Sequence, residues 1–116
     1  MASFITHFSI MAAAWLTGCS APLGSAIDAF EAGRLADAAV EFRALEPDLP
    51  ELDAHERARY ALYCGLTELA LGDLVQAERW LLPLKDAVVR SPALLSESER
   101  GALFAALRST GRMPGE

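Results

Sequence analysis

The sequence has few of the side chains on which catalytic and metal sites depend. The chain includes two histidines and two cysteines, and of the histidines only His55 lies beyond the opening segment. His55 lacks the partner histidine of a zinc-binding His-Glu-x-x-His helix, and Cys64 has no histidine nearby to activate it. Ser25 and Ser91 have no Gly-x-Ser-x-Gly setting. We therefore expect no enzyme, metal site or cofactor, and we expect Cys64 to be a small core residue.

Basic residues are outnumbered as well. The chain has 10 Lys and Arg against 16 Asp and Glu, a net charge of −6, and Lys85 is its only lysine. No basic stripe interrupts this acidic composition, which argues against nucleic acid as a partner and against electrostatic attraction to anionic lipid. No pattern predicts a small-molecule substrate, so the expected partner is another protein.

The opening segment carries no Asp, Glu, Lys or Arg. From Ile10 to Leu16 it is continuously apolar, a length typical of the hydrophobic region of a signal peptide and shorter than the ~20 residues of a membrane-spanning helix. The run Leu-Thr-Gly-Cys at residues 16–19 resembles the lipobox of bacterial lipoprotein signal peptides. The usual basic start is missing, since residues 1–9 contain no Lys or Arg. The alternative interpretation is a buried apolar helix with an incidental cysteine.

The lipobox resemblance implies that residues 1–18 are removed as a signal peptide and that Cys19 becomes a lipid-bearing N-terminus. Such a cysteine carries acyl chains such as palmitate, and each buried methylene contributes roughly 0.8 kcal/mol to membrane binding. Ser20 stands where inner-membrane lipoproteins of the enterobacterial type have Asp. The resemblance therefore implies anchoring to the outer membrane with the domain in the periplasm, and inner-membrane anchoring is the alternative.

Beyond this segment the composition indicates helices throughout. Ala, Leu, Glu and Arg are abundant, and apolar residues recur at spacings of three and four. Three pairs have the form of a capping box: Ser25-Asp28, Asp53-Glu56 and Ser96-Glu99. Glycines at 33, 72 and 111 suit the left-handed turn that ends a helix. We predict a tether over residues 19–24 and helices over residues 25–32, 35–46, 53–71, 74–88 and 96–109.

The three glycines also recur at a constant interval. Gly33, Gly72 and Gly111 each begin a Gly-polar-apolar triplet, and the step from the first triplet to the second equals the step from the second to the third. The first two glycines are followed at a fixed offset by a small residue, Ala38 and Ala77. A helix stop with constant spacing indicates an internal repeat whose unit is a helical hairpin.

Within this repeat the chain resembles the tetratricopeptide repeat (TPR) family. Two stretches carry the resemblance, 33–42 with Gly33, Ala38 and Phe42, and 63–81 with Gly65, Gly72-Asp73-Leu74, Ala77 and Leu81. It implies an all-α fold over residues 25–113, a short solenoid of two hairpins and a C-terminal capping helix. The period of 39, against about 34 in the family, predicts an extended connection near residues 47–57. Pro83 is expected to kink or end its helix near Leu82.

The TPR resemblance also implies a binding surface. In that family the first helix of each hairpin lines a concave groove, and the alignment places Arg59, Leu62, Leu66, Leu69 and Ala70 there as protein-binding residues. Their mostly aliphatic character suits an amphipathic partner helix. The alternative is that these leucines pack on the extended connection or on the final helix.

The two resemblances together predict a small outer-membrane lipoprotein that acts in the periplasm as an adaptor or assembly factor. Lipoproteins of this kind accompany envelope machines such as pili and secretion systems, type VI among them. The alternative function is a periplasmic regulator that inhibits a cell-envelope enzyme. A specific envelope partner would favour the adaptor, whereas loss of enzyme inhibition on mutating the groove would favour the regulator.

Overall fold

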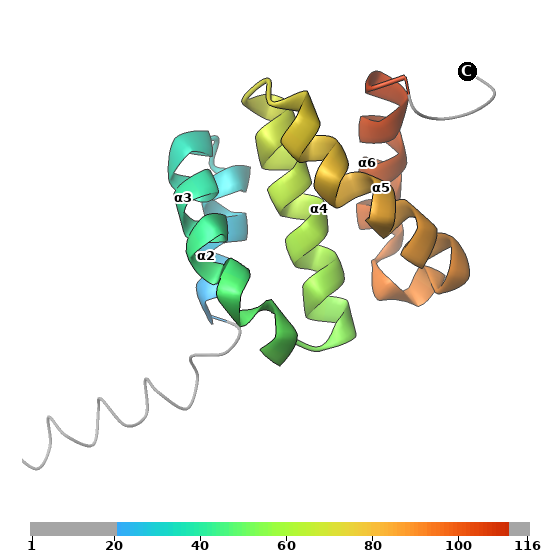
Figure 1. Cartoon of the computed structure of the whole chain (residues 1–116), viewed down its shortest axis with the longest axis horizontal. Coiled ribbons are helices and arrows are strands. Elements are labelled where there is room, and N and C mark those ends of the chain that lie inside the picture. The colour runs from blue at the N-terminus through green and yellow to red at the C-terminus, as the bar shows by residue number, and fades with distance from the viewer. Residues whose placement is uncertain (1–20, 112–116) are drawn as a thin grey trace, which may run out of the picture.

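The computed structural model describes residues 21–111, and this part of the chain is all-α, as predicted (Figure 1). Between residues 21 and 111 there are five α-helices, two 3-10 helices and no strand. They are α2 (Ala21–Glu31), α3 (Leu35–Leu45), η1 (Glu46–Glu51), α4 (Ala54–Ala70), α5 (Leu74–Arg90), η2 (Pro92–Leu94) and α6 (Glu97–Ser109). The last four α-helices match their predicted bounds to within two residues.

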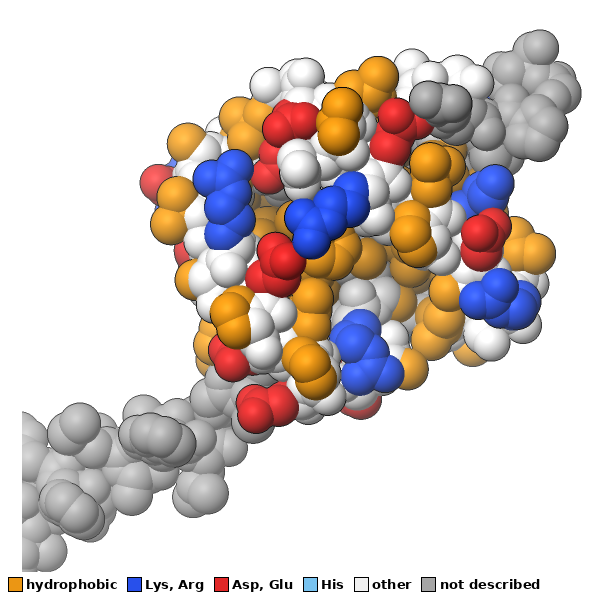
Figure 2. Space-filling view, viewed as in Figure 1, with side chains coloured by type: hydrophobic (Ala, Val, Ile, Leu, Met, Phe, Trp, Pro, Cys, Tyr) orange, Lys and Arg blue, Asp and Glu red, His pale blue; other side chains and the backbone are white. Residues whose placement is uncertain are grey.

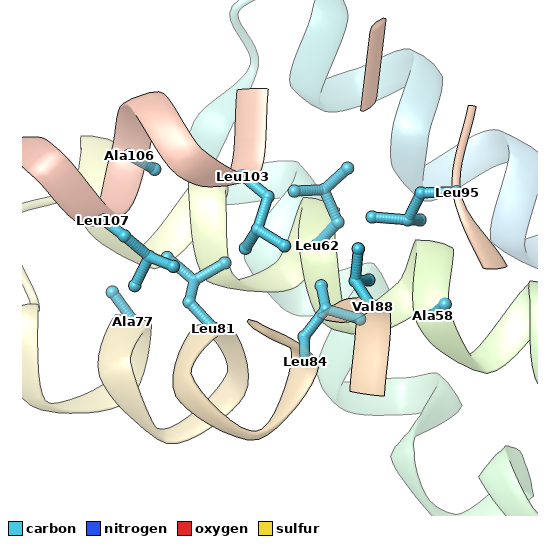
Figure 3. Packing of buried hydrophobic residues seen from close by; sticks show 10 residues of the cluster. All are labelled: Ala58, Leu62, Ala77, Leu81, Leu84, Val88, Leu95, Leu103, Ala106 and Leu107. Carbon is cyan, nitrogen blue, oxygen red and sulfur yellow. The ribbon is translucent and has the colours of Figure 1, made fainter. Parts of the chain in front are cut away.

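Successive α-helices run antiparallel, forming two hairpins and a final helix (Figure 1). α2 packs on α3, α4 packs on α5, and α6 lies against both α4 and α5. One hydrophobic cluster joins α2, α3 and α4 and includes Phe42 and Tyr60. The other joins α4, α5 and α6 and includes Leu62, Leu81 and Leu107 (Figure 3). Because α4 contributes to both clusters, it is the central helix of the molecule.

The glycine turns predicted to end helices are confirmed, and so are two of the predicted capping boxes. Gly33, Gly72 and Gly111 have φ angles of 80°, 85° and 75°, the left-handed region that favours glycine. Asp53 and Ser96 each accept a hydrogen bond from the backbone N–H three residues on, and the glutamate at that position accepts one from the cap's own N–H. Local chemistry therefore fixes where α4 and α6 begin.

Gly65 lies where α4 meets α5. A Cβ atom at this position would lie 2.6 Å from both Cγ and Cδ2 of Leu81, well inside van der Waals contact. Ala77, on α5, is fully buried at the same interface. The absence of a side chain at Gly65 thus permits the close approach of the two helices.

The first helix begins four residues earlier than predicted, at Ala21. Pro22 suits the first turn of a helix, because its fixed φ is helical and no N–H is required there. Leu23 is 2% exposed and belongs to the α2–α3–α4 cluster, so this stretch is part of the packed domain and the predicted tether is too long. Ser25 is not a cap, since it lies inside the helix and its hydroxyl donates to Glu41 of α3.

Pro83 was expected to kink or end its helix near Leu82, and the second of these outcomes is wrong, because α5 continues through Pro83 for two further turns. A proline inside a helix removes one backbone donor and costs about 3 kcal/mol. On either side of the proline, Leu81 and Leu84 are buried in the core, and this burial offsets the cost. The proline ring itself is exposed.

Candidate functional site

The face of α4 predicted to line a groove is covered by α6. Leu62 is fully buried between α4, α5 and α6, beside Leu103 in Figure 3. Leu66 and Leu69 are partly buried against the same cluster, and Ala70, at the end of the helix, is exposed. These leucines therefore form an internal interface, which corresponds to the alternative interpretation in which they pack on the final helix.

Arg59, the remaining residue of the predicted groove, also contacts α6. Its Nε atom donates to Oε2 of Glu99 at 3.0 Å, and the Tyr63 hydroxyl donates to the same oxygen at 3.1 Å. The other carboxylate oxygen of Glu99 accepts from the Ser96 N–H at 3.1 Å. Burial alone would raise the pKa of the Glu99 carboxyl, but these donors favour its charged form and lower the pKa. The group is a polar link between α4 and α6.

Cys64 is a core residue, as predicted. Its side chain is buried in the α2–α3–α4 cluster. Burial, followed by the nearby Glu68 carboxylate, raises the pKa of the Cys64 thiol to about 12. A neutral, enclosed thiol is a poor nucleophile. Within residues 21–111, no group of three or more His, Cys, Asp or Glu side chains is placed to bind a metal ion.

An open groove lies between α4 and α5, and we call it the α4–α5 groove. Its volume is about 400 Å³, toward the lower end of the ~300–1,000 Å³ of small-ligand sites. Figure 2 shows this face hollowed, with hydrophobic side chains inside the hollow and basic ones beside it. The lining residues are Ala54, Arg57, Ala58 and Ala61 of α4, Arg79, Trp80, Pro83, Leu84 and Ala87 of α5, and Leu94 of η2.

α3 is a short helix that does not reach the groove. α3 has 11 residues and α5 has 17, so α5 is roughly 9 Å longer. After Leu45 the chain enters η1, where Pro47 and Pro50 prevent continuation of an α-helix. This segment is the extended connection predicted near residues 47–57. No residue of α3 lines the groove beside α5.

Two arginines supply the polar atoms at the edge of the groove. The Arg79 guanidinium lies 5.0 Å from the centroid of the Trp80 ring and pairs with Glu46, just beyond the end of α3, at 3.1 Å. Arg57 donates to the backbone carbonyl of Leu52. None of the described residues that line the groove is acidic. The groove therefore has a basic edge on a chain whose net charge is −6.

Packed aromatic rings support the wall of the groove from behind. The Trp80 ring meets the Tyr60 ring edge-on, with 5.2 Å between centroids. Tyr60 in turn meets Phe42 edge-on at 5.4 Å, and its hydroxyl donates to the Phe42 carbonyl at 2.6 Å. These contacts connect α3, α4 and α5, so the indole is held in place by the core.

Sequence reasoning did not predict the α4–α5 groove. The TPR resemblance directed attention to another face of α4, the one that α6 covers. Two signals were available. Pro47 and Pro50 mark the early end of α3, and the small residues Ala54, Ala58 and Ala61 recur at helical spacing on a face of α4 that carries no large apolar side chain.

Comparison of the chain with protein-family models, curated proteins and solved structures finds no match in any of the three. Between residues 21 and 111, no helix is long and apolar enough to cross a membrane. Cys19 and the predicted signal peptide lie outside the described residues. The fold and the groove together define a small all-α domain with an apolar, basic-edged surface groove.

Proposed function

We propose that this protein is an outer-membrane lipoprotein whose all-α domain binds a protein partner in the periplasm. The observation that carries the binding role is the α4–α5 groove, an apolar surface with two arginines at its edge. Apolar grooves of this kind bind a partner by burying its apolar side chains, while the polar atoms at the edge fix its orientation. The protein acts as an adaptor or assembly factor of an envelope machine, such as a type VI secretion system or a pilus.

The finer proposal for the fold is a short TPR-like array. Two antiparallel hairpins, the equally spaced glycine turns and the close crossing at Gly65 support it. In such an array α6 is the capping helix, since it covers the apolar face that the second hairpin would otherwise expose.

The proposed anchor lies close to the domain. Cys19 precedes the first residue of α2, Ala21, by two positions, and two residues of chain span at most about 7 Å. A lipid on Cys19 therefore holds the start of α2 near the bilayer. The α2–α3 and α4–α5 turns lie at the other end of the helices (Figure 1). In the proposed arrangement that end faces away from the membrane.

The anchor is tested by mass spectrometry of the N-terminal peptide from envelope fractions. We expect an acylated Cys19 as the first residue, and a Cys19→Ala variant that is absent from the outer membrane. A mature chain that retains Met1 would contradict the lipoprotein proposal.

The adaptor role is tested by photo-crosslinking in living cells. A photoreactive amino acid at position 87, in the groove, should crosslink to one specific envelope protein. The same amino acid at position 105, on the exposed face of α6, is the matched control and should not. If neither position yields a specific partner, the adaptor proposal is refuted.

A further inference from the structure

The α4–α5 groove is lined by α4, α5 and η2, and no residue of α3 lines it. Glu46, the residue after α3, pairs with Arg79 near the start of α5. Past this pair α5 continues, and Pro83, Leu84 and Ala87 line the groove without any α3 residue beside them. The groove is therefore a mostly apolar space beside two helices that are already packed together.

We propose that the α4–α5 groove binds a short amphipathic helix of a protein partner, and that this helix carries acidic residues beside its apolar stripe. The inference rests on the proposed adaptor function and specifies the chemistry of the partner. In this arrangement the partner helix covers the apolar side chains of α4 and α5 that line the groove.

The form of the partner follows from the walls of the groove. Both walls are helices, so most of their backbone N–H and C=O groups are paired within each helix, apart from those at the start of α4 and at Pro83. An extended peptide buried there would leave its own backbone groups without partners, at a cost of about 1–3 kcal/mol each. A helix satisfies its backbone internally, so only its side chains have to match the groove.

The size of the groove sets the length of the contact. On α4 the lining runs from Ala54 to Ala61 and on α5 from Arg79 to Ala87, which is about two turns of each helix. A partner helix meets such a surface with apolar residues at i, i+3 or i+4, and i+7. The small alanines of α4 allow it to approach closely, and Trp80 provides the large flat surface typical of binding hot spots.

The charge of the partner follows from the edge of the groove. The lining includes Arg57 and Arg79 and no described acid. Arg79 already pairs with Glu46, but Arg57 has only a backbone carbonyl as partner among its hydrogen bonds here. A guanidinium has five N–H donors, so Arg57 has donors left for a carboxylate. An acidic helix is therefore favoured over a basic one in this groove, although the net charge of the chain is −6.

Two synthetic peptides of about 18 residues, or roughly five helical turns, test the proposal. They share one leucine stripe at helical spacing, and the flanking positions are Glu in one peptide and Lys in the other. Fluorescence anisotropy with the full chain should show binding of the acidic peptide at least about tenfold tighter than binding of the basic one. A basic peptide that binds equally well or better would overturn the charge assignment, and no binding of either would overturn the site.

Matched variants test whether the acidic peptide binds in the α4–α5 groove. Ala87→Trp fills the groove and should weaken binding of the acidic peptide at least about tenfold. Ala105→Trp, on the exposed face of α6, should leave that binding unchanged. Arg57→Glu should abolish the preference for the acidic peptide, and Arg90→Glu, an exposed arginine outside the groove, should preserve it. Circular dichroism establishes that each variant is folded. Equal affinity of Ala87→Trp and Ala105→Trp would refute the site.

The outcomes separate this inference from the adaptor function. If position 87 crosslinks to an envelope protein but the acidic peptide does not bind, the adaptor function stands and the helical acidic ligand is wrong. Oleate is a second competitor to test. If oleate displaces the bound peptide, binds more tightly than the peptide does, and loses affinity in the Ala87→Trp variant, the groove is a lipid site and the proposal is overturned.

Discussion

Gly65 and Gly101 are both glycines inside helices, but their surroundings differ. A Cβ at 65 would lie 2.6 Å from Leu81, whereas nothing lies within 4 Å of a Cβ at 101. We expect Gly65→Ala to lower the free energy of unfolding by about 1–3 kcal/mol, because Leu81 or the whole of α5 has to move. Gly101→Ala should raise it by about 0.5–1 kcal/mol through helix propensity. Urea denaturation of both variants measures the difference.

The same pair of variants can also contradict the structure. If both alanines stabilise the protein by similar amounts, α4 and α5 separate at little cost, and the crossing is not as close as described. A loss of stability in Gly101→Ala would mean that α6 has a neighbour on its exposed face.

At Cys64 the chemical consequence of burial can be measured directly. Because the pKa of its thiol is raised from 9.0 to about 12, the thiolate fraction near pH 8 falls about a thousandfold. In a Cys19→Ala chain, where Cys64 is the only thiol, we expect very slow reaction with a disulfide reagent near pH 8 and rapid reaction in denaturant. Fast labelling of the folded chain would show that the α2–α3–α4 cluster opens readily.

Among the elements, the packing of α6 on α4 depends on the ionisation of one side chain, Glu99. The pKa of the Glu99 carboxyl is below its ordinary value of 4.5, so Glu99 contributes to stability above about pH 4.5. This contribution disappears as the pH falls through the lower pKa of the folded state. We expect Glu99→Gln to destabilise the protein by about 1 kcal/mol near pH 7 and to have a smaller effect near pH 3. Thermal unfolding at the two pH values provides the measurement.

Glu97→Gln is the matched control, since Glu97 is an exposed acid in the same first turn of α6. It should change stability only slightly at either pH. A Glu99→Gln effect that is the same near pH 3 as near pH 7 would mean that the side chain acts through its shape and not through its charge.

The bounds of an element could be predicted from the sequence where they are set by contacts between residues close together in the chain, and not where they are set by contacts with other helices. α6 begins at a capping box that spans four residues, so its start could be read locally. α2 begins early because Leu23 packs in a cluster shared with α3 and α4, and such a contact is absent from local sequence. α5 continues past Pro83 for the same reason, since burial of Leu81 and Leu84 outweighs the local preference for a break.

The candidate site was less predictable than the elements. The leucines of α4 could be identified as an apolar face, but whether that face is open depends on α6, which follows only after the whole of α5. The α4–α5 groove is harder still to predict, because it depends on how α4, α5 and η2 pack together. No single stretch of sequence contains that arrangement.

For the whole molecule, α6 should be indispensable. A chain that ends at Arg90 loses Leu103 and Leu107, both fully buried, and exposes Leu62 and Leu81 of the central cluster. Each large buried side chain contributes about 2–5 kcal/mol, against a total of about 5–15 kcal/mol for a domain. We expect the shortened chain to have no cooperative urea transition and to bind a hydrophobic dye. An unchanged transition would show that α6 is not part of the cooperative unit.

Five antiparallel helices have a mechanical consequence that four would not have. Because their number is odd, Ala21 and Gly111 lie at opposite ends of the molecule (Figure 1). A force applied between these ends has a component along the helix axes, so the helices are partly pulled past one another in shear and many contacts resist together. In a bundle with an even number of helices both ends lie on one side, and the same force peels the helices apart one at a time. Tension along the chain is therefore shared by both hydrophobic clusters.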